Sequence, residues 1–90
     1  MVKQIKYKDM GNLNKIRAII GKNDILPNLE IARYSSDRVI KLTTTAVAIN
    51  FQSMDRLYKH LQNEGVNVTE MYISTMPAMN HALCIVIGCE

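Results

Sequence analysis

The sequence predicts an α+β fold, a ferredoxin-like βαββαβ arrangement with an additional C-terminal strand. Several short segments alternate apolar and polar residues, which is typical of half-buried strands. Two other segments repeat their apolar residues every three or four positions, which indicates helices that are apolar on one side. The segments follow the order strand, helix, strand, strand, helix, strand, strand. We therefore expect two helices on one face of a mainly antiparallel sheet.

The length and composition fit one small globular unit. A chain of 90 residues can bury one hydrophobic core, so we expect residues 1–90 to form a single α+β domain. Hydrophobic residues make up 48% and charged residues 21%, a balance that is too apolar for a disordered chain. The sequence contains neither the roughly 20 consecutive apolar residues of a transmembrane helix nor the apolar core of a signal peptide. We expect a cytoplasmic protein with no membrane partner.

The N-terminal segment predicts a strand followed by a helix. Val2 to Lys8 alternates lysine with apolar side chains, as in a half-buried strand. A helix is predicted over Leu13 to Ile20, with Asp9 or Asn12 as its cap and Gly21 as its stop.

A hairpin follows this first helix. Two strands, Leu29 to Tyr34 and Arg38 to about Thr44, flank the polar turn Ser35-Ser36-Asp37, with Ile40 and Leu42 pointing inward. The chain is then expected to continue as a strand to Phe51, with Val47, Ile49 and Phe51 pointing inward. A bulge is expected near Thr43 to Thr45 because the inward positions change parity there. An early start of the next helix within residues 46–51 is the competing interpretation.

The second helix is the clearest local pattern. Ser53 is the expected N-cap and Gly65 the expected stop. Between them an apolar stripe at helical spacing is formed by Met54, Leu57, Tyr58 and Leu61. A strand over Val66 to Ser74 follows the helix.

The last predicted strand, Ala82 to Ile87, is apolar on both faces and must be covered on both. Helices on one face leave the other face open, so we expect a protein partner or a second copy of the chain, most simply a homodimer. Central pairing with shielding by loops is the alternative. The flexible methionines of the preceding connection suit an adaptable surface as well as a core. The predicted protein-interface residues are Met76, Met79, Ile85 and Ile87.

Basic residues concentrate at the start of the chain. Residues 1–22 contain six basic residues and one acidic residue, whereas the remainder contains five basic and seven acidic residues. Such a segment can attract nucleic acid or an acidic partner, and lysines can also protect an edge strand from aggregation. The candidate contact residues are Lys3, Lys6, Lys8, Lys15, Arg17 and Lys22.

No pattern in the sequence points to catalysis or to a metal. Cys84 and Cys89 fall on opposite faces of a strand and cannot bind one ion together. We expect Cys84 in the core and Cys89 as an exposed thiol. His60 and His81 have no second ligand at helical or strand spacing, and nothing places a base beside a nucleophile. We expect no enzyme activity, no cofactor and no metal site.

These observations favour a small non-catalytic interaction or regulatory protein that binds another macromolecule. Proteins of this size are common among phage and mobile-element accessory proteins that inhibit a host factor. A nucleic-acid-binding module that uses the basic segment is the first alternative. The step from the second helix into Gly65-Val66-Asn67-Val68 is similar to one in ACT domains. That resemblance implies a small-ligand-sensing regulatory domain as the second alternative.

Overall fold

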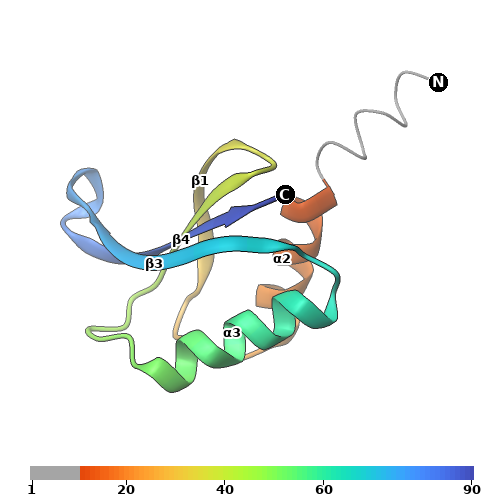
Figure 1. Cartoon of the computed structure of the whole chain (residues 1–90). Helices are drawn as coiled ribbons and strands as arrows, with labels where there is room; N and C mark the ends of the chain where they lie inside the picture. The colour runs from red at the N-terminus through yellow and green to blue at the C-terminus, as the bar shows by residue number, and fades with distance from the viewer. Residues whose placement is uncertain (1–10) are drawn as a thin grey trace.

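A computed structural model describes residues 11–90 of the chain (Figure 1). The predicted strand Val2 to Lys8 lies outside the described residues. The α+β class is confirmed, and the described elements follow the order αββαββ. In chain order they are helix α2 (Gly11–Lys22), strands β1 (Glu30–Ser36) and β2 (Val39–Thr43), helix α3 (Phe51–Asn63), strand β3 (Val68–Met76), the 3-10 helix η1 (Pro77–Met79) and strand β4 (Ala82–Cys89).

The four strands form one antiparallel sheet in the order β1-β2-β4-β3. This corrects the expected ferredoxin-like βαββαβ arrangement, in which the first strand lies between the third strand and the last. Here that central place is taken by the C-terminal strand β4, which pairs with β2 on one side and with β3 on the other. Both helices lie on the same side of the sheet (Figure 1).

The core lies between the helices and the sheet. Residues on one side of each helix and on one face of the central strands are buried, as the apolar spacing predicted. The fully or nearly fully buried members are Leu13, Ile16 and Ile19 of α2, Leu57 and Leu61 of α3, Ile40 and Leu42 of β2, and Ile85 and Ile87 of β4.

Strand β4 is buried on both faces, but its own sheet supplies the cover. Cys84 and Val86 lie on the face that the helices do not cover, yet they are only 2% and 4% exposed. Val86 is flanked in register by Lys41 of β2 and Tyr72 of β3, whose long side chains can shield it. The central position of β4 therefore meets the requirement for cover without a second copy packed on this face.

The chain after β2 differs from the predicted strand. Strand β2 ends at Thr43, residues 44–50 form a loop, and α3 begins at Phe51. The loop is held by Thr44, whose backbone N–H bonds to Leu83 and whose hydroxyl bonds to the carbonyl of Pro27. The sequence position at which the inward-pointing residues change parity is therefore the end of β2, and not a bulge within a longer strand. Val47, which was expected to point inward, is almost fully exposed.

The caps of α3 determine where the helix begins and ends. Asn50, and not the predicted Ser53, is the N-cap, because its side chain accepts a hydrogen bond of 2.8 Å from the Ser53 N–H. At the C-terminal end Gly65 has φ of +80°, as predicted for a glycine stop. The backbone N–H of the following Val66 bonds to the Leu61 carbonyl at 2.9 Å, which completes a Schellman motif.

Helix α2 is capped by a residue distant in the sequence. The carboxylate of Asp37, in the turn between β1 and β2, accepts hydrogen bonds from the backbone N–H groups of Leu13 at 2.8 Å and Asn12 at 3.0 Å. These donors belong to the first helical turn, where intrahelical acceptors are lacking. Of the two predicted caps, Asn12 lies inside the helix and Asp9 lies outside the described residues. The cap therefore links α2 directly to the sheet.

The two cysteines are both buried free thiols. The prediction for Cys84 is confirmed, and the prediction that Cys89 is exposed is wrong. Cys89 lies at the end of β4 on the helix-covered face, and its Sγ donates a hydrogen bond of 3.3 Å to the Asp37 carbonyl oxygen. Burial, together with the nearby Asp37 carboxylate, raises the pKa of the Cys89 thiol above its ordinary value of 9.0.

Candidate functional site

The predicted contact residues that the structure describes do not share one set of neighbours. Lys3, Lys6 and Lys8 lie outside the described residues. The Lys15 ammonium lies beside Gly65, at the C-terminal end of α3, whereas Arg17 lines a shallow depression against β1. Lys22 is exposed in the last turn of α2. Lys15 and Arg17 thus face different neighbours.

The four predicted interface residues also do not form one surface. Ile85 and Ile87 are fully buried in the core beneath the helices, so neither offers surface to a partner in this conformation. Met79 is exposed in η1, while Met76 is half-buried at the end of β3. Met79 borders a depression with Asn80 and His81 that does not include Met76.

The described residues present few reactive groups. Residues 11–90 hold no group of three or more histidine, cysteine or acidic side chains placed to bind a metal ion. His60 lies in the last turn of α3, and His81 lies in the hairpin between β3 and β4 with φ of +58°. Within the same range no helix is long and apolar enough to cross a membrane.

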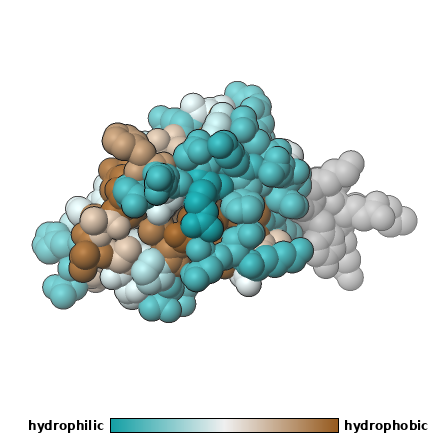
Figure 2. Space-filling model, turned by 90° about the horizontal axis from the view of Figure 1, so that it is seen from below, coloured by the Kyte–Doolittle hydropathy of each residue, from teal (hydrophilic) through white to brown (hydrophobic). Residues whose placement is uncertain are grey.

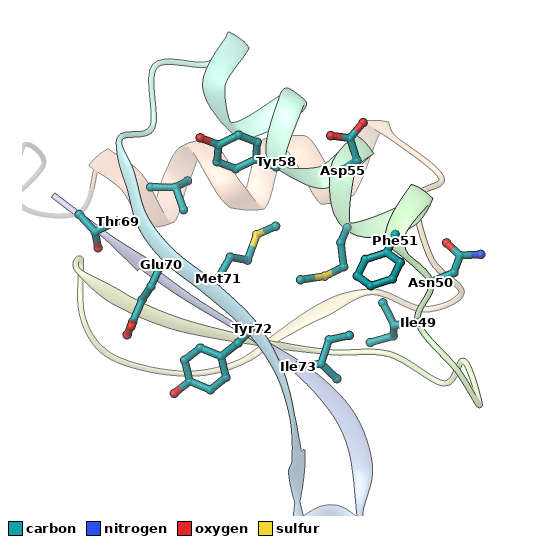
Figure 3. Close-up of a pocket in the computed structure, with 12 residues that line it drawn as sticks. Ile49, Asn50, Phe51, Asp55, Tyr58, Thr69, Glu70, Met71, Tyr72 and Ile73 are labelled. Atoms are coloured by element: carbon teal, nitrogen blue, oxygen red, sulfur yellow. The ribbon is translucent and has the colours of Figure 1, made fainter.

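An apolar groove of about 1040 Å³, here called the α3–β3 groove, lies between α3 and β3. Figure 3 shows Phe51 and Tyr58 reaching into it from α3, and Met71 entering it from β3. Phe51 stands near the Ile73 end of the strand and Tyr58 near the Thr69 end. The groove therefore runs along the strand with an aromatic ring at each end.

The side chains of this groove are exposed to an unusual degree for apolar residues. Phe51 is 93% exposed, and Ile73 and Tyr58 are 43% and 37% exposed. Seen from the side of α3, hydrophobic side chains gather toward the end where α3 begins (Figure 2). Contiguous exposed apolar surface is a common feature of sites that contact other molecules.

Strand β3 borders the groove and is an edge of the sheet. Among the described residues it pairs only with β4, so its outer row of backbone N–H and C=O groups has no strand partner. The opposite edge, β1, carries the charged residues Glu30 and Arg33 and two register irregularities, which are common protections against edge pairing. In β3 the irregularity is confined to the start, between Val68 and Glu70, and the strand is regular from there to Met76.

Two charged residues, Asp55 and Glu70, line the groove. Glu70 and Tyr72 point away from the groove toward the opposite face of the sheet (Figure 3), where the Glu70 side chain lies over Gly88. Asp55, on the rim, forms an ion pair of 3.0 Å with Lys59 one turn later in α3. An occupant of the groove would therefore meet apolar side chains on one flank and a row of backbone hydrogen-bonding groups on the other.

This site was not predicted from the sequence. Phe51 was placed on the inward face of a strand, although it begins α3 and projects into the groove. The available signal was the width of the apolar stripe on α3, because Tyr58 extends it beyond the buried Leu57 and Leu61. Scans of the chain against protein-family models, curated proteins and solved structures each found no match, so the site rests on its geometry.

Proposed function

We propose that this chain is a non-catalytic protein-interaction module whose α3–β3 groove binds an extended segment of a partner protein. The segment would add to the free edge of β3 as a further strand. Its alternate side chains would enter the groove between Phe51 and Tyr58. This mode of recognition obtains affinity from backbone hydrogen bonds and specificity from the side chains in the groove.

The observation that carries the proposal is the combination of a strand edge that is unpaired within residues 11–90 with an apolar groove along the same strand. A small ligand could use the groove but would leave the edge of β3 unpaired. An extended segment uses both, because every second residue of a strand points to one face while its backbone bonds sideways. The floor formed by Met71 and Ile73 favours apolar side chains at those alternate positions.

The two alternatives from the sequence receive less support. Nucleic-acid binding requires basic side chains that act together, and Lys15 and Arg17 lie against different elements. For an ACT-like ligand sensor, the resemblance was limited to the end of α3, where Gly65 and Val66 serve a helix cap. A general helix cap carries no information about a ligand.

A selection experiment tests the proposal without knowledge of the natural partner. The purified chain is used to select binders from a displayed library of short linear peptides, and the selected peptides are mapped by amide chemical-shift changes. We expect peptides with apolar residues at alternate positions, and shift changes along β3 and at the start of α3. Phe51→Asp should abolish their binding, whereas Val47→Asp, which charges an equally exposed residue outside this groove, should not.

The selection also defines the result that would reject the proposal. Peptides that map to another surface, or that bind Phe51→Asp as well as the native chain, would show that the groove is not the recognition site. A library that yields no binder, with the chain held at a concentration at which it is monomeric, would likewise count against an extended ligand.

A further inference from the structure

We infer that the extended segment bound by this site is strand β3 of a second copy of the chain. This inference rests on the proposed function and names the partner of the same groove. The two β3 strands would pair in antiparallel directions around a two-fold axis at Tyr72, and two four-stranded sheets would join into one continuous sheet.

The sequence of β3 is compatible with pairing to an identical strand in this register. With Tyr72 opposite its own copy, Met71 faces Ile73 of the second copy and Glu70 faces Ser74, so the full strand Val68–Met76 is paired. Glu70 is the only charged residue of β3, and this register places no like charge opposite it. Pro77, which has no N–H to donate, follows directly and limits the pairing to this length.

The same symmetry brings the two grooves together. Because paired positions share a face of the sheet, α3 of each copy would lie on the same side of the joined sheet. Phe51 stands at the Ile73 end of the groove and Tyr58 at the Thr69 end (Figure 3). The antiparallel arrangement reverses one copy, so Phe51 of each copy would approach Tyr58 of the other. Aromatic pairs of this kind stabilise an interface beyond the area they bury.

The exposed apolar area agrees with a dimer of small to ordinary size. With about 200 Å² for each of these large side chains, the exposed fractions of Phe51, Tyr58, Tyr72 and Ile73 amount to roughly 400 Å² per copy. Two copies contribute twice that area, and the strand backbone and groove rim add to it. The four side chains of both copies thus supply about 800 Å² of the roughly 1,200–2,000 Å² that specific protein interfaces bury. The β1 edge, with Glu30 and Arg33 and its irregular register, offers no comparable surface.

Sedimentation equilibrium of the full chain, with one variant at each edge of the sheet, tests the inference. Ile73→Lys places a charge at the centre of the proposed interface, and Tyr34→Lys places one on β1 at almost the same exposure, 43% against 46%. We expect a native dimer at micromolar concentration. Ile73→Lys should weaken it by at least about 100-fold, because dimerisation would bury two unpaired ammonium groups. Tyr34→Lys should leave it unchanged, and circular dichroism confirms that both variants fold.

Each other outcome overturns the inference. A native chain that is monomeric at high micromolar concentration excludes the second copy. A dimer that persists in Ile73→Lys, or that is lost in Tyr34→Lys, places the contact elsewhere. A monomer whose outward β3 amides are protected from hydrogen exchange would mean that another segment of the same chain covers the edge. Selected peptides that bind the groove of a strictly monomeric chain would keep the proposed function and remove only the self-association.

Discussion

Replacing Asp37 by alanine should destabilise the protein far more than a residue in a hairpin turn normally does. The change removes two hydrogen bonds, of 2.8 and 3.0 Å, from the carboxylate to the N–H groups of Leu13 and Asn12. A hydrogen bond to a charged group contributes about 1.5–3 kcal/mol, and loss of an N-cap costs about 0.5–2 kcal/mol. Because Asp37 is only half-buried and water can replace part of the loss, we expect about 2 kcal/mol.

The assay is urea unfolding followed by circular dichroism, together with a thermal scan. A loss of about 2 kcal/mol corresponds to a fall in Tm of roughly 8–16 °C for a domain of this size. Asp37→Asn keeps one acceptor oxygen and should lose about half as much free energy. Asp55→Ala is the control, since it removes only the exposed ion pair with Lys59, which is worth about 0.3–0.5 kcal/mol. Equal losses for Asp37→Ala and Asp55→Ala would refute the assignment of Asp37 as the cap of α2.

Three further predictions concern the end of α3, the buried thiol and the groove. Gly65→Ala should cost about 1 kcal/mol in urea unfolding, since φ of +80° strains any residue with a Cβ. Cys89 should resist a thiol reagent until the protein is unfolded. Because folding raises its pKa above 9.0, the stability that its protonated form contributes is present below that value and is lost as the pH rises above it. The native chain should therefore lose more stability between pH 8 and pH 10.5 than Cys89→Ala does; equal losses would contradict this. Phe51→Ala should change the free energy of unfolding of the monomer by less than about 0.5 kcal/mol, because the side chain is almost fully exposed. The same change should weaken binding at the groove by about 2 kcal/mol, or roughly 30-fold. The control Val47→Ala should change neither quantity. A Phe51→Ala variant that unfolds easily, or that binds as well as the native chain, would show that Phe51 belongs to the core.

The local patterns of the sequence were sufficient to predict the fold class, both described helices and most strands. Leu57 and Leu61 of α3 and Ile40 and Leu42 of β2 were placed inward, as the structure has them, because burial follows directly from the period of each element. Gly65 was identified as a helix stop from its conformational freedom alone. These features depend only on neighbours in the chain.

The features that were missed depend on contacts between distant segments. No local pattern states that the C-terminal strand β4 lies at the centre of the sheet, although its apolar character on both faces is consistent with that place. The cap of α2 by Asp37 joins residues more than twenty positions apart, and the carbonyl of the same Asp37 accepts the hydrogen bond of the buried Cys89 thiol. The groove was missed because Phe51 has the same local pattern whether it points into a core or out of one.

The central claim, that β3 pairs along its free edge with β3 of a second copy, can be tested by a single disulfide. In the proposed register Tyr72 lies opposite itself, and the Cα atoms of directly opposed antiparallel residues are about 4.5–5.5 Å apart, within the range that a disulfide spans. Tyr72→Cys should therefore form a covalent dimer under mild oxidation at least about ten times faster than Val47→Cys, a more exposed control that only random collision can link. Equal rates of cross-linking for the two variants, measured on non-reducing gels, would contradict the account.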